Sequence, residues 1–295
     1  DANGSITSGT IDYFGADDHQ PIRLSELKKE KDWLKVRGHE IAMIMQDPMT
    51  SLNPLKTIGD QIMEAVELHQ GLKGAAALRR YCCTLMERLN CLVWDVDYCL
   101  APEKAFPAAV HESYGIAEYA FDHAAELGVD PEKIILAGHS AGGNLVAAAC
   151  IQNAETHKLR PCCVLMEYFP VDNTVDPTDR LSPELKQDSF WVKRSATEKL
   201  YTDFYVGDAD PAQPLCSPIK ADEAALSTFP DCLILSAGED SLRNDTEAFA
   251  LRLIKAGVCV TAQRIPEAMH GFTTNRTPGW ERALDAHCKF FREHL

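Results

Sequence analysis

Short apolar runs alternate with longer amphipathic stretches from about residue 90 to the end of the chain. Runs of four to six mainly apolar residues are typical of buried strands, and stretches with a 3.6-residue period are typical of helices. We expect strands at 91–96, 133–137, 164–168 and 232–236, and a last strand that begins at Val258. We expect helices at 108–127, after residue 140, at 245–256 and at 280–294. This alternation predicts an α/β fold whose mostly parallel sheet is covered by helices on both faces.

One segment interrupts the alternation. Residues 170–220 are rich in Pro and Asp and contain a single helical stretch, at about 183–205. An insertion between strands of an α/β sheet usually lies over the site, so we expect a small lid here.

The first quarter of the chain has a different pattern. It predicts a strand with a turn at 9–15, a charged helix at 24–37, a strand at 41–45 and a helix at 57–69. The change of character predicts two parts, residues 1–74 and residues 75–295.

The chain has 295 residues, enough for one large α/β domain or for one domain and a fragment. Its formal net charge of −15 argues against nucleic acid or an anionic membrane as a partner. No apolar run approaches the roughly 18 residues of a membrane span, so no membrane insertion is expected. Asp1 is not Met and the first residues show no signal-peptide pattern, which indicates a start inside a longer coding region. The sequence carries no indication of oligomeric state.

Eleven cysteines are present, an odd number, and none are spaced Cys-x-x-Cys. Several lie in apolar runs, among them Cys150, Cys232 and Cys259, and are expected to be buried thiols. This usage predicts a reducing cytoplasm, with no metal and no cofactor.

The strongest chemical signal is the run Gly138-His139-Ser140-Ala141-Gly142, which lies between a predicted strand and a predicted helix. A Gly-x-Ser-x-Gly turn in that setting exposes the serine hydroxyl at the sheet edge as a nucleophile. Such a turn is expected to need glycine on both sides of the serine, because a Cβ there would collide with the strand and helix. His139 is expected to be only a partly exposed neighbour. The N–H of Ala141 is the expected first donor to an oxyanion.

A serine nucleophile needs a base and an acid that orients the base. His270 follows the last predicted strand, so a loop can return it to the sheet edge as the base. Asp240 follows the strand at 232–236 and is the preferred acid, with Glu239 and Asp245 as alternatives. Asp245 has a second explanation, since it lies at the start of a predicted helix where negative charge is favoured.

With these motifs, residues 80–295 resemble the hormone-sensitive-lipase-like branch of the α/β-hydrolases, which includes bacterial acetyl esterases. Further motifs that carry the resemblance are Asp97-Tyr98-Cys99-Leu100-Ala101-Pro102-Glu103, Gly238-Glu239-Asp240-Ser241 and His270-Gly271-Phe272. The resemblance implies a serine carboxylesterase that hydrolyses short-chain acyl esters with Ser140, His270 and Asp240. Aromatic residues that could line an acyl pocket are Tyr168, Phe169, Phe190 and Trp191.

The resemblance also implies further oxyanion donors from a His-Gly-Gly-Gly loop about 70 residues before the serine. This sequence has only His69-Gln70-Gly71-Leu72-Lys73-Gly74 at that distance. Gly71 is either a substitute donor or the residue that ends the preceding helix. The first strands of the hydrolase sheet are also missing, which predicts an unpaired sheet edge and an exposed apolar face. A catalytically impaired fusion is therefore an alternative to an active esterase.

Residues 5–74 resemble the ATP-binding subunit of an oligopeptide ABC transporter. The run that carries this resemblance is Arg37-Gly38-His39-Glu40-Ile41-Ala42-Met43-Ile44-Met45-Gln46-Asp47-Pro48-Met49-Thr50-Ser51-Leu52-Asn53-Pro54. No Gly-x-x-x-x-Gly-Lys-[Ser/Thr] phosphate loop is present, so ATP hydrolysis is not expected. A nucleotide-binding fragment related to these transporters is the third alternative.

Overall fold

The computed structural model describes residues 12–13, 22–23, 73–181, 185–187 and 189–295. The chain divides into two units, residues 1–76 and residues 77–295. In the first unit, strand β1 (Asp12–Tyr13) pairs antiparallel with β2 (Ile22–Arg23). The elements predicted at 24–37, 41–45 and 57–69, together with Gly71, lie outside the described residues.

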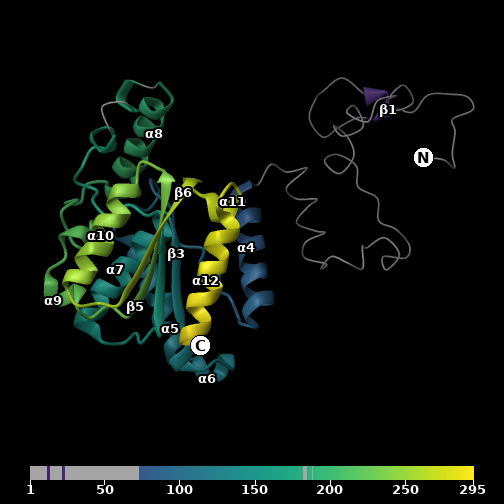
Figure 1. Ribbon diagram of the computed structural model, residues 1–295, viewed down its shortest axis with the longest axis vertical. Coiled ribbons are helices and arrows are strands. Elements are labelled where there is room, and N and C mark those ends of the chain that lie inside the picture. The colour runs from purple at the N-terminus through teal and green to yellow at the C-terminus, as the bar shows by residue number, and fades with distance from the viewer. Residues whose placement is uncertain (1–11, 14–21, 24–72, 182–184, 188) are drawn as a thin grey trace, which may run out of the picture. The chain divides into compact units, whose positions relative to one another are not determined.

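The second unit is built on a parallel sheet (Figure 1). In the described part of the chain the sheet has the order β3-β4-β5-β6. Its strands are β3 (Ile135–His139), β4 (Cys163–Glu167), β5 (Asp231–Glu239) and β6 (Val260–Met269). Every adjacent pair is parallel, which confirms the predicted α/β class.

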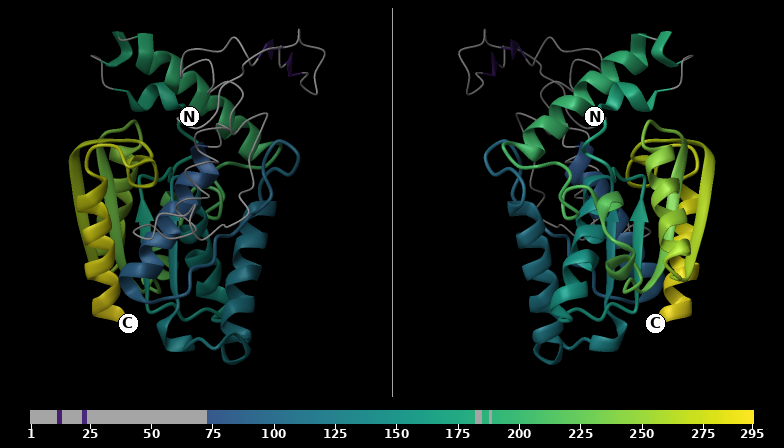
Figure 2. Two further views of the ribbon diagram at one scale, coloured as in Figure 1. Left: turned by 90° about the vertical axis from the view of Figure 1, so that its right-hand side faces the viewer. Right: turned by 90° about the vertical axis from the view of Figure 1, so that its left-hand side faces the viewer.

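Helices cover both faces of this sheet (Figures 1 and 2). One face packs against α4 (Lys73–Leu89) and α12 (Trp280–His294), and the other against α7 (Ala141–Thr156) and α10 (Arg243–Lys255). Successive strand residues alternate between the two cores: Leu233 and Leu235 lie in the first, and Ile234 in the second. The central strands β4 and β5 are therefore buried on both faces, as their apolar sequences require, while the outer strands β3 and β6 are partly exposed.

Smaller helices complete the second unit. They are α5 (Ala108–Asp122), α6 (Ala124–Leu127), α8 (Ser189–Val206), α9 (Glu223–Leu226) and α11 (Phe272–Asn275). Single 3₁₀ turns lie at Pro131–Lys133, Pro177–Arg180, Leu185–Gln187 and Pro218–Lys220. The predicted helix 280–294 has the bounds of α12, whereas the one predicted at 108–127 is divided at His123 between α5 and α6. Helix α4 was not predicted.

The strand predicted at 91–96 is wrong. Residues 91–100 have no regular structure, and Leu92, Trp94 and Leu100 are 56, 41 and 66 % exposed. A strand persists only where a neighbour accepts its hydrogen bonds, and no described strand pairs with this segment. Strand β3 is instead the edge of the described sheet on this side, as the missing first strands predicted.

The insertion between β4 and β5 contains α8, which Figure 1 shows beyond the carboxyl ends of β5 and β6. Asn144 in the first turn of α7 fastens the base of the insertion. Its buried amide donates to the carbonyl oxygens of Pro170 (3.0 Å) and Cys216 (3.3 Å). The hydroxyl of Tyr205 on α8 donates to the Asn144 Oδ1, at 3.4 Å.

All eleven cysteines are free thiols. Cys150 and Cys232 are buried as expected, but Cys259 is exposed because it lies just before the start of β6. None of the helices in the described ranges combines the length and the apolar character that a membrane span requires.

Candidate active site

Ser140 lies in the sharp turn between β3 and α7. Its φ and ψ are +52° and −122°, a conformation that L-residues rarely adopt. Its backbone N–H donates to the carbonyl oxygen of Glu167 at 2.9 Å, which holds the turn against β4. A Cβ on Gly138 would lie 2.1 Å from the carbonyl oxygen of Gly142, so the residue two before the serine has to be glycine.

The expectation for the second flanking glycine is wrong. A Cβ on Gly142 would meet no atom within 4 Å among those described. The steric demand falls on the next residue, since a Cβ on Gly143 would lie 2.6 Å from the Cβ of Phe169. The helix is therefore pressed onto β4 at Gly143, while Gly142 faces open space.

His270 lies directly after β6, as predicted. Its Nε2 is 2.8 Å from the Oγ of Ser140. Gly271 follows with φ +76°, a left-handed conformation that suits glycine and turns the chain into α11. The ring of Tyr168 packs edge-on against the imidazole at 5.1 Å between centroids and supports it from the side of β4.

Asp240 lies at the end of β5, next to an irregularity in the pairing with β6 between Ala237 and Glu239. Its Oδ2 is 2.8 Å from the Nδ1 of His270, and its side chain is fully buried. Its Oδ1 accepts the N–H of Leu242 at 3.2 Å. The carboxylate thus fixes the imidazole with Nδ1 as donor and Nε2 facing the serine.

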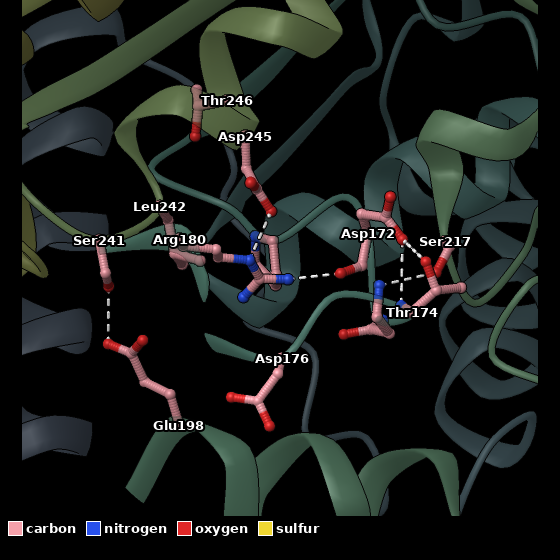
Figure 3. Close-up of polar contacts among 12 residues, drawn as sticks. Asp172, Thr174, Asp176, Arg180, Glu198, Ser217, Ser241, Leu242, Asp245 and Thr246 are labelled. Atoms are coloured by element: carbon pink, nitrogen blue, oxygen red, sulfur yellow. Dashed lines mark hydrogen bonds and ion pairs between the residues drawn. The ribbon is translucent and has the colours of Figure 1, made fainter. Parts of the chain in front are cut away.

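The two alternative acids do not contact His270. Glu239 is exposed. Asp245 is directed at Arg180, with 3.3 Å between Oδ2 and Nε (Figure 3). Burial raises the pKa of the Asp245 carboxyl, and the nearby Arg180 guanidinium opposes this shift. Asp240 is the acid of the three that the fold brings to the histidine.

Two of the four aromatic residues predicted to line an acyl pocket are buried instead. Tyr168 and Phe169 are 1 and 0 % exposed. Tyr168 packs beneath His270, and Phe169 packs into the core against Gly143 and Phe249. The side chains of Phe190 and Trp191 lie outside those described.

Of the two residues predicted to donate an N–H to the oxyanion, the structure describes one. Ala141 is exposed and is the first residue of α7, so its N–H has no acceptor within the helix and is available at the serine. Gly71 lies outside the described residues, so its predicted role stays a prediction.

The insertion is tied to the loop that carries the acid (Figure 3). The hydroxyl of Ser241 donates to Glu198 on α8 at 2.8 Å. Arg180 donates to the backbone oxygen of Asp172 and pairs with Asp245. These contacts join the segment above the sheet to the residues around Asp240, which the sequence pattern did not indicate.

A second polar group lies below the serine. His139 is partly exposed, as expected, with 12 % of its side chain accessible, and its Nε2 lies 3.1 Å from Glu167 Oε2. The fully buried His287 on α12 lies on the other side of Glu167, with 3.7 Å between its Nε2 and the same oxygen. These are the described side chains that are grouped as metal ligands would be. The one signal in the sequence was an acid within the apolar run of β4.

Known proteins resemble two separate parts of the chain. An arylesterase from Saccharolobus solfataricus is 35 % identical over 191 residues, which cover 64 % of this chain and 60 % of that protein. The oligopeptide transport ATP-binding protein AmiE from Streptococcus pneumoniae is 54 % identical over 69 residues, 23 % of this chain and 18 % of that protein. Both resemblances inferred from the motifs are confirmed.

Among solved structures, a hyperthermophilic esterase from the archaeon Pyrobaculum calidifontis is 30 % identical, with a TM-score of 0.65, over 73 % of this chain and 70 % of that one. The α/β-hydrolase fold family matches residues 70–274, which include Ser140, Asp240 and His270. The chain belongs to the α/β-hydrolase fold family.

Proposed function

We propose that this protein is a serine carboxylesterase that acts on small acyl esters, with Ser140 as nucleophile, His270 as base and Asp240 as the orienting acid. The observation that carries the proposal is the unbroken relay from Ser140 Oγ to His270 Nε2 and from His270 Nδ1 to Asp240 Oδ2, each contact 2.8 Å. The esterase names of the relatives support the same chemistry.

In the first half of the reaction, Ser140 Oγ attacks the ester carbonyl carbon while His270 Nε2 takes its proton. The resulting oxyanion accepts the N–H of Ala141, and the buried Asp240 carboxylate stabilises the imidazolium. The alcohol then leaves with the proton from His270. Water attacks the acyl-serine with the help of the same imidazole, releases the acid and restores Ser140.

The size of the acyl group is inferred from the resemblance to acetyl esterases, which act on short chains. Further oxyanion donors are the weak point of the proposal. Losing one donor typically lowers the rate by about 10²–10³. If Gly71 does not supply an N–H, the relay would remain with a slower turnover, which is the impaired alternative.

The free cysteines support a reducing compartment. Eleven thiols without a disulfide are what we expect of a cytoplasmic protein, and we propose that location.

The test is a fluorophosphonate probe on the purified full chain, with the modified residue mapped by mass spectrometry. We expect labelling at Ser140, no labelling of Ser140→Ala, and p-nitrophenyl acetate turnover that Ser140→Ala abolishes. Ser227→Ala is the matched control, because Ser227 is exposed at the C-terminal end of α9 and should leave both readouts unchanged. A folded chain that does not react with the probe would establish the impaired alternative.

Nucleotide chemistry is not proposed for the transporter-like segment. The segment keeps a glutamine-containing motif but the chain has no phosphate loop, so nothing holds the triphosphate. An ATP analogue should leave the melting temperature unchanged, and an increase would favour the nucleotide-binding alternative.

A further inference from the structure

Three side chains meet in the interior directly below Ser140. His139 comes from the end of β3, Glu167 from the end of β4 and His287 from the middle of α12. Glu167 and His287 have fully buried side chains. One ligand atom from each residue lies within 4.8 Å of the other two.

The atoms that face one another in this cluster are the ones left without hydrogen bonds. His139 Nε2, Glu167 Oε2 and His287 Nε2 are buried, and none has a hydrogen-bond partner of acceptable geometry. Buried polar atoms are normally paired, since leaving one unpaired costs about 1–3 kcal/mol. Three such atoms around one point indicate a missing shared partner.

The opposite ends of two of these side chains, His287 and Glu167, are already occupied. The hydroxyl of Tyr81 lies 3.0 Å from His287 Nδ1, and the hydroxyl of Thr273 donates to Glu167 Oε1 at 2.7 Å. Contacts of this kind orient the ligands of metal sites and set which imidazole nitrogen binds. They leave His287 Nε2 and Glu167 Oε2 as the free ends, both aimed into the cluster.

Hydrogen bonds among the three side chains do not satisfy this arrangement. Glu167 Oε2 could accept an Nε2–H from each neutral imidazole, but neither contact has the geometry of a hydrogen bond. Burial lowers the pKa of His287 and favours its neutral imidazole, the form that coordinates metals. A cation that accepts lone pairs from all three atoms at once does satisfy it.

We propose that His139, Glu167 and His287 bind one divalent transition-metal ion, with Zn²⁺ as the best match to two imidazole nitrogens and one carboxylate oxygen. Zinc lies about 2 Å from nitrogen and oxygen ligands, so two of its ligand atoms are about 3–4 Å apart. The two contacts to Glu167 Oε2, of 3.1 and 3.7 Å, lie in that range, and all three ligand atoms lie within 4.8 Å of one another.

The ion would have a structural role. With one carboxylate, two neutral imidazoles and a hydroxide in the fourth position, its charge is balanced inside the protein. It would join the ends of β3 and β4 to α12 beneath the turn that holds Ser140. Because Glu167 and His287 are fully buried, the ion would enter during folding and exchange slowly afterwards.

The experiment uses the full chain without an affinity tag. It is unfolded in denaturant with a chelator, refolded with Zn²⁺ or with chelator alone, and separated from free metal by gel filtration. We expect about one zinc per chain by mass spectrometry of the metal, and a melting temperature several degrees above that of the chelator-refolded protein. Retention of no zinc by the folded chain overturns the proposal.

Two variants and one matched control locate the ion. Glu167→Gln and His287→Gln should lose the zinc. His294→Gln, on the same helix and paired with Asp231 at 3.1 Å, should keep it. Equal zinc in all three variants would contradict the assignment.

Cobalt distinguishes this site from the eleven thiols and does not depend on the variants folding. Wild-type protein refolded with Co²⁺ should show visible bands of tetrahedral cobalt without the near-ultraviolet band of cobalt bound to sulfur. A strong sulfur band would show that cysteines hold the metal and would overturn the proposal.

Discussion

The two flanks of Ser140 differ sharply. On one side β4, β5 and β6 follow in a parallel ladder with one irregularity, between Ala237 and Glu239, and the strands β5 and β6 end beside Asp240 and His270. On the other side β3 has no described strand beside it, and residues 91–100 run without regular structure with large apolar side chains exposed. We call the first side, which contains the buried strands β4 and β5, the finished flank, and the second side the open flank.

This difference between the flanks separates the proposed proton relay from the proposed oxyanion site. The proposed relay uses only the finished flank, so its geometry does not depend on the open one. The described residues provide one N–H for the proposed oxyanion site, that of Ala141, and the further donor predicted at Gly71 lies outside them. The proposed relay is therefore complete in the described residues, and the proposed oxyanion site is not.

The largest expected effect is on the relay of the finished flank. Asp240→Asn keeps the shape but removes the negative charge and favours the wrong imidazole tautomer, so kcat for p-nitrophenyl acetate should fall by about 10⁴. The control is Glu239→Gln, one residue earlier and exposed, which should change kcat by less than about tenfold. Similar losses in the two variants would contradict the choice of acid.

The same truncation, leucine to alanine, should cost more stability on the finished flank than on the open flank, because the leucine is buried only on the finished flank. Leu233→Ala removes a side chain that is 1 % exposed in β5, and should lower the free energy of unfolding by about 2–5 kcal/mol. Leu92→Ala removes one that is 56 % exposed, and should change it by less than about 0.5 kcal/mol. Denaturant titration measures both, and a large loss in Leu92→Ala would mean that this side chain is covered in solution.

Substituting the glycines of the serine turn should have the next largest effect on stability. Gly138→Ala places a Cβ against the backbone of Gly142 and should cost about 1–3 kcal/mol, with reduced labelling of Ser140 by the fluorophosphonate probe. Gly142→Ala meets no described atom and should be neutral in melting temperature. If Gly142→Ala keeps its stability but loses activity, a segment covers this position when substrate binds.

The smallest expected change in stability comes from a charge on the open edge. Ala137 in β3 is exposed, so Ala137→Lys should alter the free energy of unfolding by less than about 0.5 kcal/mol. It should still reduce self-association at high concentration, measured by light scattering, because lysine on an edge strand blocks pairing with another chain. Unchanged association would indicate that the edge is already covered.

The sequence was sufficient for the finished flank because its signals are local. The strands β4 and β5 follow apolar runs, α12 follows its helical period, and Ser140 lies in the turn that Gly138 predicts. Asp240 could be preferred from its place after β5, but only the packing shows that Glu239 faces solvent and Asp245 faces Arg180.

Long-range packing explains the errors. Residues 91–96 have the composition of a strand, but strand formation depends on a neighbour that the local pattern does not specify. Tyr168 and Phe169 were predicted to line a pocket because the sequence does not show whether an aromatic side chain is buried in the core or faces a pocket. The partners of Glu167 come from sequence positions more than 100 residues away and from one adjacent strand, so no local period could have grouped them.

Asn144 has a consequence for how this fold changes over time. A single amide in α7 holds Pro170 and Cys216 together and so closes the base of the insertion between them. Lengthening a closed loop costs only about 0.6 kcal/mol for each doubling. The segment between residues 170 and 216 can therefore change in length and in sequence during evolution and adapt the site to a different substrate. The sheet beneath it would stay the same.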